Sequence, residues 1–197
     1  MQVKTTFGRR VAVCLTTVLA FIGMVAAPVQ ADTEKPPPGI SAEAWRARPA
    51  APVFSASASP ILCFSGHVQG IGWTAWDCND GDWAYAGTEN QSLSLEAILI
   101  IAENTGGKTC ARAHSKDIGW GAFPCEYDKR EFAVGTTGQG RQMEAFEFGN
   151  TNRTTCNNAH VQNSGWQQYG CVGADQYRIA GTTGQSLRLE MAAATIL

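Results

Sequence analysis

Apolar and polar residues alternate over residues 92–99, near the middle of the chain. Leucine or alanine stands at the odd positions, and serine or glutamate stands at the even positions up to Glu96. Because successive side chains of a strand point to opposite faces, this period of two predicts a half-buried β-strand. The corresponding stretches further along are less regular, with Arg141 in the place of Leu93 and small residues at 192–194.

The N-terminal segment has a different pattern. Residues 1–10 are basic, residues 11–27 are apolar and uncharged, and Val29-Gln30-Ala31 places small residues where a signal peptidase cuts. A membrane anchor is the alternative, but a spanning helix needs about 20 apolar residues and this run is shorter. We therefore predict a signal peptide over residues 1–31 and a secreted, extracellular mature chain.

Residues 32–61 are rich in proline, alanine and serine. Such a composition supports neither a long helix nor a strand ladder, so it predicts a linker or a tail that follows the protein surface. Residues 40–46 can form one helical turn. Trp45 then either docks on the domain or stays free.

The chain from Leu62 onward repeats one pattern three times. Each copy has a cysteine, a histidine four residues later, a Gly-Trp pair, an aromatic residue three positions after that tryptophan, a second cysteine, a Gly-Thr loop and a late glutamate. A fixed internal period of this kind indicates repeated structural units. We expect one β domain over 62–197, composed of the repeats 62–108, 109–154 and 155–197.

The third copy carries the most recognisable motif. It reads His160-Val-Gln-Asn-Ser-Gly-Trp166, followed by Ala180-Gly-Thr-Thr-Gly-Gln-Ser-Leu-Arg-Leu-Glu190. This sequence resembles the ChW repeat (clostridial hydrophobic, with a conserved tryptophan), although paired cysteines depart from the usual pattern. The resemblance implies an exported surface module for polysaccharide or protein binding, without catalytic activity.

The six cysteines of the mature chain could pair in 15 ways. A constant separation of 15 residues within each copy selects three pairs, and an exported chain favours disulfides over free or metal-bound thiols. The seventh, Cys14, lies in the predicted signal peptide. The predicted disulfides are Cys63–Cys78, Cys110–Cys125 and Cys156–Cys171.

The midpoint of each cysteine pair falls on turn residues, which predicts a stapled hairpin with a two-residue turn. In that register His67 and Trp73 lie on opposite faces, unless a bulge at Gly72 shifts them. The later Gly-Thr-Thr-Gly loops predict a fixed turn, because no lysine follows as in a phosphate-binding loop. Asn90 replaces Gly138 and Gly184 there, so we expect positive φ at these three positions.

Four short strands per repeat predict an all-β, pseudo-threefold unit. A β-trefoil suits this length best, and a β-prism with one sheet per repeat is the alternative. The chain contains neither the Gln-x-Trp motif of ricin-type trefoils nor the Gln-x-Asp-x-Asn motif of monocot-lectin prisms.

Composition limits the function. Removing residues 1–31 leaves 12 basic and 17 acidic residues, a net charge of −5. Such a weakly acidic module has no electrostatic footprint for nucleic acid or for an anionic membrane. We also expect no catalytic activity, because no recognisable nucleophile or asymmetric pair of acids is present. No cofactor and no metal are expected, and we expect a monomer.

Three recurring residue sets are candidates for ligand binding. The tryptophans of the Gly-Trp pairs can stack on sugar rings or pack in the core, the aromatic residues that follow can form a rim, and the glutamates can bind sugar hydroxyls or accept hydrogen bonds from turn amides and threonines. One histidine per copy indicates a structural hydrogen bond rather than a shared zinc. The candidates are Trp73, Trp120, Trp166, Trp76, Phe123, Tyr169, Glu96, Glu144 and Glu190.

The sequence therefore predicts a secreted, non-catalytic module for cell-wall or extracellular polysaccharide. The alternative is a protein-interaction or structural module at the cell surface. Stronger glycan binding is expected at the first and third copies, because the candidate set of the second has no phenol: Trp120, Phe123 and Phe132.

Overall fold

The computed structural model describes residues 35–55, 59–79 and 82–197, which belong to one compact unit spanning Glu34–Leu197. The predicted signal peptide lies outside the described residues. Each repeat contributes five strands rather than the predicted four, because the return half of each hairpin is split into two short strands.

The first repeat follows a short helix, α1 (Ala42–Arg46), and contains β1 (Ile61–Val68), β2 (Gly72–Trp73), β3 (Asp77–Cys78), β4 (Ala84–Gly87) and β5 (Leu95–Glu103). The second contains β6 (Lys108–Ser115), β7 (Gly119–Trp120), β8 (Cys125–Tyr127), β9 (Phe132–Gly135) and β10 (Met143–Asn150). The third contains β11 (Thr155–Val161), β12 (Gly165–Trp166), β13 (Gly170–Val172), β14 (Gln176–Gly181) and β15 (Leu189–Ile196).

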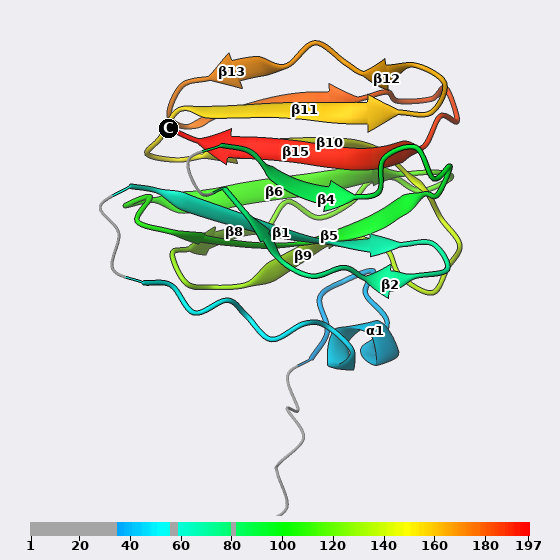
Figure 1. Ribbon diagram of the computed structural model, residues 1–197, viewed down its shortest axis with the longest axis horizontal. Coiled ribbons are helices and arrows are strands. Elements are labelled where there is room, and N and C mark those ends of the chain that lie inside the picture. Colours follow the sequence, from blue (N-terminus) through cyan, green and yellow to red (C-terminus); the bar gives the residue numbers. More distant parts are fainter. Residues whose placement is uncertain (1–34, 56–58, 80–81) are drawn as a thin grey trace, which may run out of the picture. The chain divides into compact units, whose positions relative to one another are not determined.

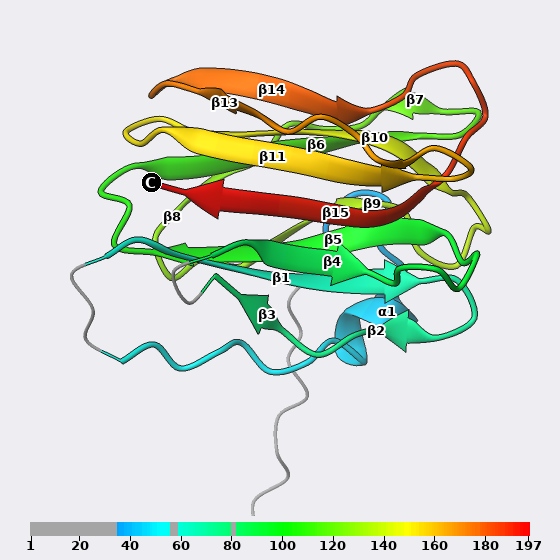
Figure 2. The same ribbon diagram turned by 45° about the horizontal axis from the view of Figure 1, so that its top comes forward.

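These strands form three five-stranded antiparallel sheets, and no sheet comes from a single repeat (Figures 1 and 2). The fourth strand of each repeat pairs with the last strand of another repeat: β9 with β5, β14 with β10, and β4 with β15. We call the sheets containing β1, β6 and β11 the first, second and third sheet. The all-β prediction is confirmed, and one edge of each sheet is covered by a strand from a different repeat.

One face of every sheet points into a common core. Its largest fully buried side chains include Phe64 of the first sheet and Phe148 of the second, whose rings meet edge to face at 5.8 Å. The third sheet contributes mainly small residues such as Ala192 and Ala194. The opposite face of each sheet, called the outer face below, carries the recurring histidines and tryptophans.

The three predicted disulfides are present: Cys63–Cys78, Cys110–Cys125 and Cys156–Cys171. The register near each disulfide is also the predicted one, with Cys63 opposite Cys78. Closer to the turn the register shifts by one residue, so that His67 faces Trp73. The prediction that these two side chains lie on opposite faces is therefore wrong, because the turn contains three residues rather than two.

The late glutamate of each repeat lies in a β-bulge. In the first sheet His67 pairs with Ala97 and Val68 pairs with Leu95, which leaves Glu96 as the extra residue. The same irregularity recurs at Glu144 and Glu190. A bulge changes the direction of a side chain relative to regular alternation, and here it directs a carboxylate among otherwise apolar neighbours.

The predicted half-buried strand is instead buried along its whole length, Leu95–Glu103. Its inner side chains, including Ile98 and Ile100, join the core, whereas Ala97 and Leu99 on the outer face are covered by the segment that contains α1. That segment supplies Ile40 and Trp45, so the tail follows the surface and Trp45 is docked.

The Gly-Thr loops have the expected backbone. Asn90, Gly138 and Gly184 have φ angles of 61°, 70° and 69°, which confirms the predicted left-handed turn in all three copies. The three loops therefore share one conformation although their sequences differ.

Candidate functional site

A glutamate, a histidine and a tryptophan form the same cluster on the outer face of every sheet. The distance from the histidine Nδ1 to a glutamate oxygen is 3.0 Å for His67–Glu96, 3.1 Å for His114–Glu144 and 3.3 Å for His160–Glu190. All three carboxylates are buried, at 3–6% exposure. The bulge and the adjacent strand thus give the glutamate a histidine partner, rather than the turn amides or threonine hydroxyls expected from the sequence.

Each tryptophan of a Gly-Trp pair packs edge to face on that histidine. The ring centroids lie 5.0 Å apart for Trp73–His67, 5.2 Å for Trp120–His114 and 5.5 Å for Trp166–His160. None of these tryptophans belongs to the buried core, and Trp166 is 36% exposed. The three tryptophans therefore lie outside the common core, although Trp73 packs against the apolar cluster of Trp45 and Leu99.

A loop from a different repeat completes each cluster. The amide of Thr136 donates to the carbonyl of Glu96 over 2.9 Å, and the amides of Thr182 and Thr88 make the equivalent bonds to Glu144 and Glu190. Each of these loops follows a fourth strand, so the exchange of fourth strands places the loop beside the sheet of another repeat. Every outer face is consequently a composite of two repeats.

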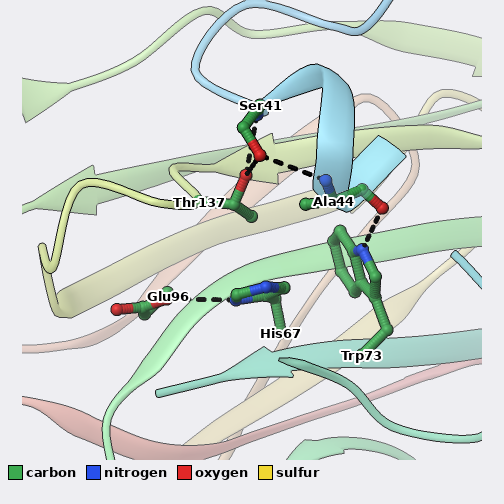
Figure 3. Close-up of polar contacts among 6 residues, drawn as sticks. All are labelled: Ser41, Ala44, His67, Trp73, Glu96 and Thr137. Atoms are coloured by element: carbon green, nitrogen blue, oxygen red, sulfur yellow. Dashed lines mark hydrogen bonds and ion pairs between the residues drawn. The ribbon is translucent and has the colours of Figure 1, made fainter. Parts of the chain in front are cut away.

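The outer face of the first sheet is covered by the polypeptide segment around α1. Figure 3 shows its polar contacts: the indole of Trp73 donates to the carbonyl of Ala44 over 2.8 Å, and the amide of Ser41 donates to the Thr137 hydroxyl over 2.7 Å. The Thr137 amide donates in turn to the carbonyl of Gly39. Gly39 has a φ of 89°, and a Cβ there would lie 2.5 Å from the oxygen of Gly135, so only glycine allows this close approach.

Side chains of the same segment fill the rest of this face. Trp45 is only 4% exposed and packs with Ile40 on the outer side chains of β5 and β9. Arg48 lies over the Trp45 ring and pairs with Glu131, and the indole of Trp76 donates to the carbonyl of Ala50. Both candidate tryptophans of the first copy are thus already bonded to the chain itself.

The outer face of the second sheet carries an ion pair at its centre. Arg112 pairs with Glu147 and also lies over the rings of Trp120 and Phe123. Tyr177, from the third repeat, meets Phe123 edge to face at 5.0 Å. The second copy therefore does have a phenol nearby, which the sequence comparison within one repeat did not reveal.

The outer face of the third sheet contains an open cleft of about 640 Å³ with aromatic walls. Trp83 meets Tyr169 at 5.8 Å, and Tyr85 meets Trp166 at 6.1 Å. Each pair joins a residue of the first repeat to one of the third. The remaining lining includes the polar side chains Asn158 and Thr195 and the small residue Ala193.

Small side chains leave room for this cleft at the centre of the third outer face. Ala193 occupies the position of Leu99 in the first sheet and of Glu147 in the second. Asn158 likewise corresponds to Arg112, so no ion pair or bulky residue fills the centre of the third sheet.

The hydroxyls of Tyr85 and Tyr177 stay protonated above neutral pH. Burial raises the pKa of Tyr85, and the charges of Asp82, Asp77 and Glu89 raise it further. Burial also raises the pKa of Tyr177, together with its hydrogen bond to Asp175. Tyr85 can therefore donate a hydrogen bond to a ligand, whereas the Tyr177 hydroxyl already donates to Asp175.

The structure brings each predicted histidine, glutamate and tryptophan together but separates the aromatic sets assumed for each copy. Trp83 and Tyr85 join the third face rather than the first, and Tyr177 joins the second rather than the third. Sequence reasoning missed Thr137, Asn158 and the docked Ser41. No signal within one repeat could have found the contact of Thr137 with Ser41, because it joins a loop of the second repeat to the tail on the first sheet.

Within 35–55, 59–79 and 82–197, no group of three or more histidine, cysteine or acidic side chains is arranged to hold a metal ion. In the same part of the chain, no helix has the length and hydropathy of a membrane span.

Comparison with protein families supports the motif analysis. The model of the ChW family, described as Clostridial hydrophobic W, matches residues 67–104 and 160–190. These segments lie in the first and third repeats, which confirms the resemblance there. No curated protein and no solved structure matches the chain.

Proposed function

We propose that this protein is a secreted, non-catalytic binding module that holds a saccharide in the cleft of the third sheet. The observation that carries the proposal is the cleft itself, with four aromatic rings around polar groups. Ligand sites are typically concave, with aromatic walls, a few polar groups and a volume of about 300–1,000 Å³. A pyranose presents an apolar C–H face to a ring and hydroxyls to an amide or a threonine, and the cleft offers both kinds of group.

The exposed rings of the cleft are the main contacts in this proposal. Tyr169 is 61% exposed and Trp166 is 36% exposed, so both present ring surface to solvent. In contrast, Trp73 and Trp76 are covered by the tail. The proposed binding strength is therefore highest at the third face, with the second face as a weaker site, rather than stronger at both the first and third copies than at the second.

The remaining candidates divide by their position. Trp120 and Phe123 are proposed contacts on the second face. The glutamates are buried against histidines, so their proposed role is to orient the tryptophan through the histidine rather than to touch a sugar: Glu96, Glu144 and Glu190.

The test is retention of the secreted protein on insoluble polysaccharides, followed by a glycan array. Tyr169→Ala and Trp166→Ala should weaken binding about fivefold each, because an exposed ring contact contributes about 1 kcal/mol. Tyr127→Ala is the matched control, since Tyr127 is 59% exposed and does not line the cleft. Equal retention of all three variants and the parent protein would contradict a saccharide site in this cleft.

Polypeptide binding is a second candidate, and a specific observation favours it. The first outer face holds a peptide segment through hydrogen bonds from Trp73, Trp76 and Thr137 and through a buried tryptophan. The docking of this segment supports a protein-interaction module as the second candidate.

We also infer a prism-like arrangement of the three sheets rather than a trefoil. The presence of three separate sheets, each with four strands of one repeat and the fourth strand of another in cyclic order, supports this inference.

A further inference from the structure

The first outer face binds the tail with a pair of groups that we call the clamp. One group is the indole N–H of the tryptophan in the Gly-Trp pair. The other is the side chain that directly follows the first threonine of the Gly-Thr loop, which is Thr88, Thr136 or Thr182 in the three copies. In the first sheet these groups are Trp73 and Thr137. Thr137 accepts the amide of Ser41, and Trp73 donates to the carbonyl of Ala44. The clamp therefore grips a helical turn by one backbone N–H and one backbone C=O, three residues apart (Figure 3).

The helical turn of the tail that the clamp binds also has its own N-cap. The Ser41 hydroxyl accepts the amide of Ala44 over 3.1 Å, as expected for an N-cap serine, and the Thr137 hydroxyl also donates to it. A serine at this position thus satisfies its own helix and the clamp together.

In the third sheet the clamp is closed. Glu89 stands at the position of Thr137, and its carboxylate accepts the indole N–H of Trp166 over 3.2 Å. The Trp166 indole N–H, which would donate to a ligand carbonyl, already donates to Glu89. The third face therefore lacks the polypeptide-binding pair, although its aromatic cleft is open.

In the second sheet the clamp has the same residue types as the first and is open. Trp120 and Thr183 correspond to Trp73 and Thr137, and no residue in the described part of the chain makes a hydrogen bond to the Trp120 indole N–H or to the Thr183 side chain. The backbone is the same, since Gly181 and Gly184 have φ angles of 107° and 69°, against 101° and 70° at Gly135 and Gly138.

We propose that the Trp120–Thr183 clamp binds a polypeptide segment in trans, through a helical turn capped by serine. The partner chemistry follows from the clamp that is filled: a hydroxyl that accepts one backbone N–H, and an indole that donates to a backbone carbonyl three residues later. This proposal does not depend on a saccharide in the third cleft.

Two differences define how the partner must deviate from the tail. The side-chain amide of Gln167 makes hydrogen bonds to both the N–H and the C=O of Gly181. Gly181 corresponds to Gly135 of the first sheet, which Gly39 of the tail approaches closely. The partner therefore needs only the turn from the position of Ile40 onward. The centre of the second outer face is also more polar than that of the first. Glu147, which is paired with Arg112, stands in the place of the Leu99 on which the tail packs.

The test uses the full secreted chain, labelled with ¹⁵N, and an unlabelled capped peptide with the sequence of residues 40–50. The six tryptophans give six indole N–H signals, assigned by Trp→Phe variants. We expect the peptide to shift the Trp120 signal saturably. Thr183→Val should weaken that binding about three- to tenfold, the effect of one lost hydrogen bond, whereas the exposed Thr154→Val should not.

Glu89→Thr provides a gain of function in the same experiment. It frees the Trp166 indole and places a threonine in the third clamp, so the Trp166 signal should begin to respond to the peptide. The proposal is overturned if the Trp120 signal does not move, if it moves equally in Thr183→Val, or if only Trp73 responds. The last result would mean that the peptide merely exchanges with the docked tail.

Discussion

Replacing Trp45 by alanine tests whether its burial holds the tail on the first sheet. The side chain is 4% exposed and packs on Ala97, Leu99 and Ala133, with Arg48 over its ring. Truncating a buried tryptophan to alanine costs about 3–5 kcal/mol. The hydrogen bonds of Ser41 and Ala44 to the clamp remain possible, but each contributes only about 1 kcal/mol.

The expected result is local undocking rather than global unfolding. A segment can open independently of the core, so global stability can fall by no more than the free energy of docking. Trp45→Ala should therefore lower the melting temperature modestly. It should also abolish the slow hydrogen exchange of the Trp73 indole, whose N–H is protected by the carbonyl of Ala44.

The assay is hydrogen exchange followed on the indole N–H signals, with urea unfolding in parallel. Val53→Ala is the matched control, because Val53 belongs to the same segment and is 99% exposed. If the Trp73 indole stays as protected in Trp45→Ala as in the parent protein, the hydrogen bonds alone hold the segment and the reasoning from apolar burial is wrong.

Two further predictions concern single residues. Gly184→Val should destabilise the fold by about 1 kcal/mol or more in urea unfolding, because its φ is 69° and β-branched residues avoid that region. The cost comes from the backbone, since no atom lies within 4 Å of the added Cβ. Gly173→Val is the control, because φ of Gly173 lies outside this range, and an equal loss of stability in both variants would contradict the argument. The raised pKa of Tyr85 means that the folded state retains the phenol proton longer than the unfolded state, so stability should fall as pH rises past about 10, the unfolded value. Urea unfolding between about pH 9 and 11 should show a shallower fall in Tyr85→Phe, and identical slopes would refute the link.

The sequence by itself determined the features that depend on local spacing. A constant separation of cysteines predicted the three disulfides, and the swap of Asn90 for Gly138 and Gly184 predicted the left-handed turn. Both are short-range properties, since a hairpin of fixed length brings its ends together and a positive φ restricts the residue type. The three-residue turn was not predicted, because the spacing of the cysteines fixes the register at the disulfide but not at the turn.

Only the tertiary structure decided which residues share a surface. Each repeat gives its fourth strand to another sheet, so Trp83 and Tyr85 meet the aromatic residues of the third repeat rather than those of their own. The docking of Trp45 likewise depends on Leu99 and Ala133, which come from two repeats. Periodicity within one copy contains no information on these contacts, because strand exchange and tail docking are settled by the burial of apolar surface across the whole domain.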